Sequence, residues 1–199
     1  VNNLSFKRNN KKIFENINIS LAPNNMIHIK GTNGIGKTTL IKILSNILLP
    51  TNGSIFWNNK NINKDLNNYY KDMTLIMDTN TSKKDMTIIE NINFWKTIFL
   101  SNKKDDEIDS LLDLLGIYKY KNIMTKYISR GEARKLELCR LIIENKKLWL
   151  LDEPYLGLDQ NTIGTINETF KSHTKKEGMI IFTSHFNPQI PNINELDLN

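Results

Sequence analysis

The stretch from residue 31 to residue 39 constrains what this chain can fold into more than any other part of the sequence. Its glycines, followed by Lys37 and Thr38, match the pattern G-x-x-x-x-G-K-[ST]. Glycines reach backbone angles that are closed to other residues, so such a loop can wrap tightly with its N–H groups turned inward around an anion. Residues 26–30 predict a strand before it, and residues 38–44 predict a helix after it. This context favours a phosphate-binding loop over a glycine-rich turn that binds nothing.

The loop predicts a nucleoside triphosphate site that uses Mg²⁺. The N-terminus of the following helix adds partial positive charge at the phosphates. We expect Lys37 to reach the β- and γ-phosphates and the Thr38 hydroxyl to hold Mg²⁺. The predicted nucleotide-binding residues are Gly31, Thr32, Asn33, Gly34, Ile35, Gly36, Lys37, Thr38 and Thr39.

Composition sets the remaining limits. The 199 residues suggest one domain with at most a subdomain, and 39% hydrophobic residues suffice for a sizeable core. No apolar run approaches the about 20 residues that a membrane-spanning helix needs. The single cysteine, Cys139, lies among apolar residues, which predicts a buried core residue and favours a reducing compartment. The net charge of +6 accompanies abundant Asn, Lys and Ile throughout, as a very A+T-rich genome produces, so we do not assign nucleic-acid binding to it.

Short apolar patterns predict a β-rich beginning of the chain. Residues 4–6 and 17–21 alternate apolar and polar side chains, as half-buried strands do. Residues 55–57 follow a turn-like segment and predict another strand, so we expect an antiparallel β-layer here. Residues 74–77 predict a short strand of the core.

From Met86 onward the pattern becomes helical. Apolar residues recur on one helical face between residues 88 and 99 and again between residues 108 and 115, where Gly116 is a stop signal. This block interrupts an α/β pattern. We therefore expect a helical subdomain inserted at about residues 85–128 into a single domain that spans residues 1–199.

Two continuous apolar runs, residues 148–151 and 179–182, predict strands buried on both faces of a parallel sheet. Asp152 and Glu153 follow the first run, and His185 follows the second. Polar residues at the carboxyl ends of such strands lie where open α/β sheets bind ligands. We expect Asp152 to hold Mg²⁺ directly or through water, Glu153 to be the base for an attacking water, and His185 to hydrogen-bond the γ-phosphate.

Ser129 and Glu132 form a capping-box pattern, which gives this serine a complete structural explanation. A second interpretation adds to the first. A capped helix start with Gly131 exposes N–H groups that can bind a phosphate, including one held by another subunit.

The order and spacing of these motifs resemble those of ABC-transporter ATPase domains over essentially the whole chain. Residues 31–39 and 148–153 correspond to the Walker A and Walker B motifs. Residues 128–132, Ile-Ser-Arg-Gly-Glu, resemble the LSGGQ signature with three departures. Residues 157–159, Gly-Leu-Asp, resemble the D-loop. The resemblance implies an α/β P-loop NTPase fold of the ABC type, with a mixed-sheet core, an N-terminal antiparallel β-layer and an inserted helical subdomain.

The same resemblance implies an ATP hydrolase that works as a nucleotide-sandwich homodimer. The P-loop of one subunit and the signature helix of the other would enclose each ATP, and a lone copy should hydrolyse ATP poorly. The residues implied at the shared boundary are Ser129, Arg130, Gly131 and Glu132 of the signature and Asp159 of the D-loop.

Two positions depart from the family pattern. Asp78 falls where most members carry the Q-loop glutamine, and its shorter side chain could still bind Mg²⁺ or water. No aromatic residue falls at the adenine-stacking position near the start of the chain. Arg8 falls there, with Phe6 nearby, and an arginine can stack on adenine.

Within ABC proteins the chain is similar to the heme-exporter ATPases of cytochrome c maturation, the CcmA family. This resemblance implies an ATP-hydrolysing subunit, bound peripherally to a membrane beside a permease subunit of the CcmB type. Motion would pass to that permease through a groove beside Asp78 and the helical block. The segments that carry the similarity are residues 4–5, 14–16, 87–94, 148–154 and 178–185.

Two alternatives remain open at this point. The chain could energise another exporter of the ABC-2 type, or be a soluble ABC ATPase without a transport role, for which the positive charge is the only support. The Asn, Lys and Ile bias suits an organelle-encoded protein or a reduced bacterium. We therefore expect the matrix face of a mitochondrial inner membrane, with the cytoplasmic face of a bacterial inner membrane as the alternative.

Overall fold

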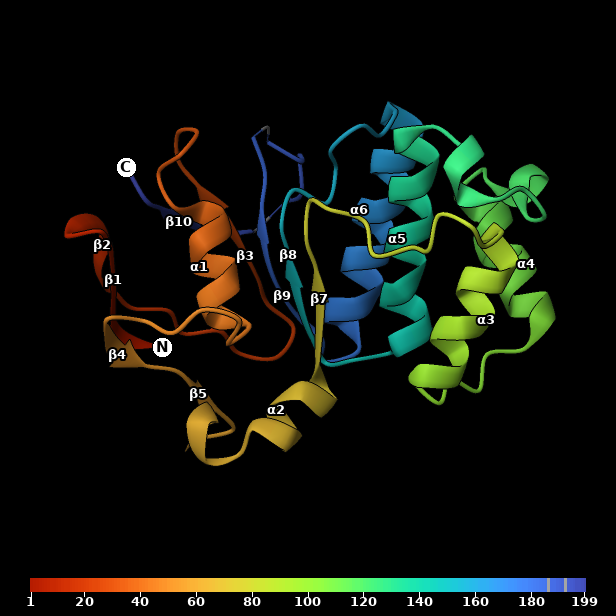
Figure 1. The fold of residues 1–199 in the computed structure, drawn as a ribbon. Helices are drawn as coiled ribbons and strands as arrows, with labels where there is room; N and C mark the ends of the chain where they lie inside the picture. Colours follow the sequence, from red (N-terminus) through yellow and green to blue (C-terminus); the bar gives the residue numbers. More distant parts are fainter. Residues whose placement is uncertain (186, 192) are drawn as a thin grey trace.

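The computed structural model describes residues 1–185, 187–191 and 193–199, and Figure 1 shows its elements. The strands are β1 (Asn2–Arg8), β2 (Lys11–Ile17), β3 (Met26–Lys30), β4 (Asn52–Ser54), β5 (Phe56–Trp57), β6 (Lys60–Asn61), β7 (Met73–Ile76), β8 (Leu148–Leu151), β9 (Met179–Thr183) and β10 (Asn194–Asp197). The α-helices are α1 (Lys37–Leu44), α2 (Leu66–Asp72), α3 (Ile88–Ile98), α4 (Asp105–Leu114), α5 (Arg130–Glu144) and α6 (Gln160–Lys175). The 3-10 helices are η1 (Ile62–Lys64), η2 (Tyr118–Tyr120) and η3 (Thr125–Tyr127).

The N-terminal β-layer is an antiparallel sheet with the strand order β2-β1-β4. The layer confirms the prediction, but the extent of one predicted strand and the place of another were wrong. The strand expected at residues 17–21 is β2, which ends at Ile17. Ile19 is buried from a coil instead, where its backbone N–H bonds to the carbonyl of Val1 at 3.1 Å. The strand expected at residues 55–57 does not join the layer, because β5 pairs with β6 in a separate hairpin and β4 takes its place.

The core is a five-stranded sheet with the order β10-β3-β9-β8-β7, in which every pair is parallel, whereas the resemblance implied a mixed sheet. Strand β8 shows why the expected apolar runs are continuous. Leu148 and Leu150 pack into a core that includes α1, whereas Trp149 and Leu151 pack into a second core that includes α5 and α6. Each face of the sheet is therefore covered, as predicted, and Cys139 lies fully buried in the second core.

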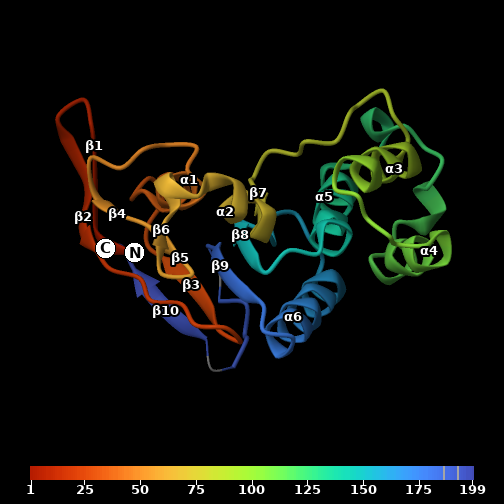
Figure 2. The same ribbon diagram turned by 90° about the horizontal axis from the view of Figure 1, so that it is seen from below.

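The helices lie on both sides of this sheet. Figure 1 shows α1 on one side and α5 and α6 on the other, and α3 and α4 lie beyond α5, away from the sheet (Figure 1, Figure 2). Helix α3 begins at a capping box made by Thr87, and Gly116, with φ +68°, follows the end of α4. Among the helices of the described ranges, none is both long and apolar enough to cross a bilayer.

Candidate functional site

The glycine-rich loop lies between the end of β3 and the start of α1. Gly36 precedes the helix with φ +123°, and a Cβ at this position would lie 2.6 Å from Cγ2 of Ile13 in β2, so only glycine fits. Lys37 is 6% exposed, and its Nζ donates to the carbonyls of Gly31 at 2.8 Å and Thr32 at 3.2 Å. The loop thus curls around the lysine ammonium at the start of the helix.

Asp152 joins this loop to the carboxyl ends of two core strands. Its Oδ1 accepts hydrogen bonds from Oγ1 of Thr38 at 3.1 Å and from Oγ1 of Thr183 at 2.8 Å. The residue is 1% exposed, and its Oδ2 accepts no hydrogen bond from any residue in the described ranges. Since buried carboxylate oxygens are rarely left without a partner, Oδ2 is suited to a cation or to water.

Glu153 follows in a left-handed backbone conformation with φ +48°. Its N–H donates to Oγ1 of Thr183 at 2.9 Å, and its carboxylate contacts His185 twice, at the backbone N and at Nε2, both at 3.2 Å. Burial raises the pKa of Glu153, and the nearby charge of His185 opposes that rise. A carboxylate with a raised pKa beside a phosphate-binding loop can act as a general base.

A cleft of about 490 Å³ opens between the loop and the strand ends. Asp78 reaches this cleft from the segment after β7, and Arg8 reaches it from the end of β1. Phe6 does not, because it is 8% exposed and packs against Phe14 with ring centroids 6.3 Å apart. The lining residues are Arg8, Asn33, Gly34, Gly36, Lys37, Thr38, Thr39, Lys42, Asp78, Asp152, Glu153, Leu156 and His185.

Sequence reasoning missed several residues that line this cleft or hold the residues lining it. Lys42 and Leu156 line it without having been singled out. Thr183, which bonds to both acidic residues, stands in a run of polar residues that the sequence shows directly before His185. Arg134, described below, interrupts the apolar face of α5, and a charge at such a position is a signal that could have been used.

The signature and D-loop residues form a second group, which does not line the cleft within one chain. Ser129 caps α5 as predicted: its Oγ accepts from the N–H of Glu132 at 3.2 Å, and the Glu132 carboxylate accepts from the N–H of Ser129 at 2.7 Å. Gly131 approaches the D-loop so closely that a Cβ there would lie 2.8 Å from the carbonyl oxygen of Gly157. The two motifs therefore form one continuous surface.

Asp159 has a structural role at this surface. Its carboxylate accepts from the N–H of Thr162 at 2.8 Å and so caps α6, and it lies 3.0 Å from Nζ of Lys135 in α5. These hydrogen bonds hold the pKa of Asp159 well below its usual range. Asp159 thus fixes the start of α6 against α5.

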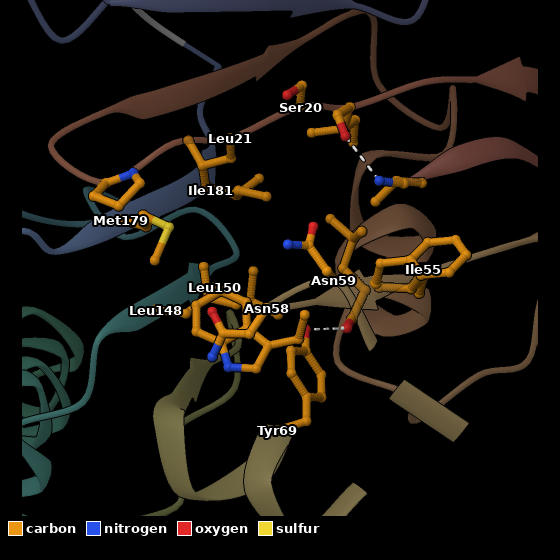
Figure 3. Close-up of a pocket in the computed structure, with 16 residues that line it drawn as sticks. Ser20, Leu21, Ile55, Asn58, Asn59, Tyr69, Leu148, Leu150, Met179 and Ile181 are labelled. Carbon is orange, nitrogen blue, oxygen red and sulfur yellow. Dashed lines mark hydrogen bonds between the residues drawn. The ribbon is translucent and has the colours of Figure 1, made fainter. Parts of the chain in front are cut away.

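A separate cavity of about 390 Å³ lies between the core sheet and the β5–β6 hairpin (Figure 3). Figure 3 shows Leu148, Leu150, Met179 and Ile181 on the sheet side, and Asn58 and Asn59 of the hairpin facing them. None of the predicted site residues lines this cavity, so it is distinct from the cleft at the glycine-rich loop.

The sequence of this chain is similar to a family model and to known proteins. A family model described as ABC transporter matches residues 14–156. The "Cytochrome c biogenesis ATP-binding export protein CcmA" of Reclinomonas americana is 37% identical over 202 residues, which cover 100% of this chain and 90% of the relative. The protein of the same name from Haemophilus ducreyi is 29% identical over 199 residues, covering 100% of this chain and 95% of the relative.

Solved structures show the same fold at lower identity. A putative ABC transporter ATP-binding protein from Pyrococcus furiosus superposes with a TM-score of 0.85 at 21% identity, covering 99% of this chain and 95% of that one. A structure described as the ATP-binding subunit of an ABC transporter gives a TM-score of 0.81 at 21% identity, with coverage of 93% and 78%.

Proposed function

This chain belongs to the ABC transporter family as an ATP-binding subunit, and we propose that it hydrolyses ATP to drive the heme-export complex of cytochrome c maturation. The observation that carries the hydrolytic part is the convergence of the P-loop, Asp152 and Glu153 on one cleft. The assignment to cytochrome c maturation rests on the names of the relatives, which are cytochrome c biogenesis export proteins.

The P-loop residues bind the triphosphate. Inward N–H groups and the N-terminus of α1 stabilise its negative charge, and Lys37 contributes a full positive charge on the β- and γ-phosphates. Lys42 and Arg8 add positive charge at the edge of the cleft. Arg8 is the candidate to stack on adenine, because its guanidinium is planar and Phe6 is enclosed in the core.

The donor set at the bottom of the cleft fits Mg²⁺. The Thr38 hydroxyl and the Asp152 carboxylate would hold the ion, and Asp78 could hold it directly or through water. Asp152 Oδ2, buried without a partner in the described ranges, is the atom that supports this fit. Among the same residues no group of three or more His, Cys, Asp and Glu side chains could hold a metal unaided, and Mg²⁺ in such sites takes its other ligands from phosphates and water. When bound, the ion neutralises phosphate charge.

Glu153 and His185 carry the chemistry. Glu153 accepts the proton of the attacking water, and its raised pKa makes it a stronger base than an exposed glutamate. His185 lies 3.2 Å from the Glu153 carboxylate, where it orients that side chain and can hydrogen-bond the γ-phosphate.

The second half of the site comes from a second subunit. In the proposed homodimer, Ser129, Arg130, Gly131 and Glu132 of one copy face the triphosphate held by the other, with Asp159 beside them. An integral permease of the CcmB type receives the motion, so the chain works peripherally on a membrane. We place it at the matrix face of a mitochondrial inner membrane or, alternatively, at the cytoplasmic face of a bacterial inner membrane.

The test compares two substitutions in the assembled membrane complex. Lys37→Ala should weaken ATP binding and turnover together, because it removes a phosphate contact. Glu153→Gln should keep ATP affinity and lower kcat by about 10²-fold or more, because it removes the general base. Glu168→Gln is the matched control, since this exposed carboxylate on α6 pairs with Lys171 and does not line the cleft. Unchanged turnover in both test variants would contradict the mechanism.

Co-purification tests the choice of partner. A chain tagged in its native membrane should bring down cytochrome-maturation membrane proteins. Recovery of a polysaccharide or drug exporter permease would instead assign it to another ABC-2-type exporter. A nucleic-acid affinity that survives at physiological ionic strength and falls steeply with added salt would support a non-transport ABC ATPase.

A further inference from the structure

One buried arginine of α5 joins the segments that carry the acidic residues of the cleft. Arg134 is 3% exposed, and within the described residues its guanidinium donates to backbone carbonyls alone. Nη2 bonds to the carbonyls of Asp152 at 2.9 Å and Glu153 at 2.8 Å, Nε bonds to that of Pro154 at 3.3 Å, and Nη1 bonds to that of Met77 at 2.5 Å. Figure 1 shows α5 beside β7 and β8, from whose ends these carbonyls come.

Packing alone does not account for a charge at this position. In the described ranges no carboxylate oxygen lies within ion-pair distance of Arg134, although burial of an isolated charge is costly. Burial lowers the pKa of Arg134, and the nearby charges of Glu137, Asp152, Asp78 and Glu153 oppose that effect. An apolar side chain would fill the same space without a desolvation cost. The arginine is therefore best explained by the four carbonyls it holds.

The carbonyls belong to a turn that needs support. Glu153 has φ +48°, a left-handed conformation that is unfavourable for a residue with a side chain. Its N–H is fixed by Thr183, and its carbonyl is fixed by Arg134. Both peptide units that flank the Glu153 side chain are therefore held, which sets the direction of its carboxylate.

The fourth carbonyl extends the same hold to a second segment of the chain that lines the cleft. Met77 directly precedes Asp78, which lines the same cleft as Glu153. One rigid guanidinium thus spans the turn that carries Glu153 and the start of the segment that carries Asp78. A lysine cannot reproduce this, because its ammonium has three donors and lacks the planar fork.

We propose that Arg134 is a positioning residue that fixes Glu153 and Asp78 relative to each other and thereby sets the rate of hydrolysis without contributing to ATP affinity. The inference rests on the proposed ATPase function. Arg134 lies behind the Walker B turn and does not line the cleft, so it acts through the backbone it holds and not through contact with the nucleotide.

The test is the split between kcat and ATP affinity, both measured in the assembled membrane complex. Arg134→Met keeps length and removes every donor. We expect kcat to fall about 10- to 100-fold, as a displaced general base predicts, while the Kd for ATP stays within about threefold of wild type. Arg134→Lys should recover part of the lost kcat, because an ammonium can still reach some of the carbonyls.

Arg140→Met on the same helix is the control for loss of a buried arginine. Arg140 bonds to the side chains of Glu137, Glu144 and Thr81, none of which lines the cleft. This variant should lower Tm and leave kcat within about threefold of wild type.

Several outcomes would overturn the proposal: a kcat for Arg134→Met within threefold of wild type, a Kd for ATP that weakens as much as kcat falls, or an equal loss of kcat in Arg140→Met. If Arg134→Met does not fold, the change in kcat is compared with the change in the Kd for ATP in Arg134→Lys instead. If neither variant folds, the proposal is rejected and Arg134 is assigned to folding alone. If wild-type turnover is absent or insensitive to Lys37→Ala, the ATPase function itself fails. Normal turnover in Arg134→Met with a Lys37-dependent wild type refutes only the role of Arg134.

Discussion

The hydroxyl of Thr183 shows how much of the site depends on one atom. It donates to Oδ1 of Asp152 at 2.8 Å and accepts from the N–H of Glu153 at 2.9 Å, and the residue is 0% exposed. The two acidic residues are adjacent in the sequence but have different environments. The Thr183 hydroxyl holds the Asp152 carboxylate, which also bonds to Thr38 of the P-loop. The same hydroxyl holds the backbone N–H of Glu153 in its left-handed conformation.

Thr183→Val tests how much of the contribution of Thr183 comes from its hydrogen bonds and how much from the shape of its side chain. The valine keeps the branched side chain but leaves the Glu153 N–H and one lone pair of Asp152 without a partner, which costs about 1–3 kcal/mol of unfolding free energy. ATP turnover should fall with it, because both acidic residues lose a constraint. Urea unfolding and steady-state kinetics measure the two effects, and Thr183→Ser, which keeps the hydroxyl, should be close to wild type in both. A valine variant with wild-type stability would show that the hydroxyl is dispensable.

Residues of the site differ in how far the sequence alone could predict them. The P-loop residues, Asp152 and Glu153 are set by spacing within a few positions of a strand, so local patterns predict where they lie. Thr183 and Arg134 act on partners that are 31 and up to 57 positions away in the sequence. Only the parallel pairing of β8 with β9, and of β7 with β8, brings those partners together.

At the scale of elements, two helices begin with the same N-terminal capping motif. Thr87 caps α3 and Ser129 caps α5, each with a capping box completed by a glutamate three residues later. The first stands in the helical block, and the second at the surface proposed to meet another subunit. The pair allows the structural role of a cap to be separated from a role in phosphate binding.

Ser129→Ala and Thr87→Ala should each lower the unfolding free energy by about 1 kcal/mol, because each leaves a helix N–H without its cap. Only Ser129→Ala should also reduce ATP turnover, since Thr87 lies away from the nucleotide. Chemical denaturation and turnover assays on the two variants provide the comparison. Equal turnover in both would restrict Ser129 to its capping role.

Element boundaries near the start of the chain were less predictable than those of the core. Helices α3, α4 and α5 have strong periodicity and clear stop or cap signals, and the continuous runs of β8 and β9 need burial on two faces. The alternation at residues 17–21 predicted a strand, yet β2 ends at Ile17; in the coil beyond it, Ile19 is buried and Leu21 is partly buried. Alternation records which side chains face inward, and it does not record where a strand ends: the backbone of Ile19 still exchanges two hydrogen bonds with Val1, yet it lies outside β2.

At the scale of the whole molecule, two histidines packed in the core make the stability of the fold depend on pH. His28 lies in β3, 2% exposed, with Nε2 3.3 Å from the carbonyl oxygen of Ser184 and its ring stacked on Phe182. His173 in α6 stacks on Trp149 with ring centroids 3.6 Å apart. Burial lowers the pKa of both histidines from the ordinary value of 6.5.

The fold should therefore lose stability in mild acid. With a folded-state pKa below the unfolded value, the unfolded chain binds more protons, so the histidine contribution is complete above pH 6.5 and is lost as the pH falls below it. The slope should approach about 1.4 kcal/mol per pH unit for each histidine. Urea unfolding between pH 7 and pH 5.5 measures this slope, and His173→Gln should remove the part of the slope that His173 contributes. A slope that is flat in wild type over this range would contradict the expected protonation.

The bonds that Lys37 makes within its own loop change what nucleotide binding means for this protein. Its ammonium is held by the carbonyls of Gly31 and Thr32, so a phosphate must compete with an internal ligand for the same donors. On binding, the ammonium exchanges carbonyl partners for phosphate partners. The net gain in binding free energy is therefore smaller than for an ammonium that had no protein partner before. The affinity lost in Lys37→Ala reports that difference, and it understates the strength of the phosphate contact itself.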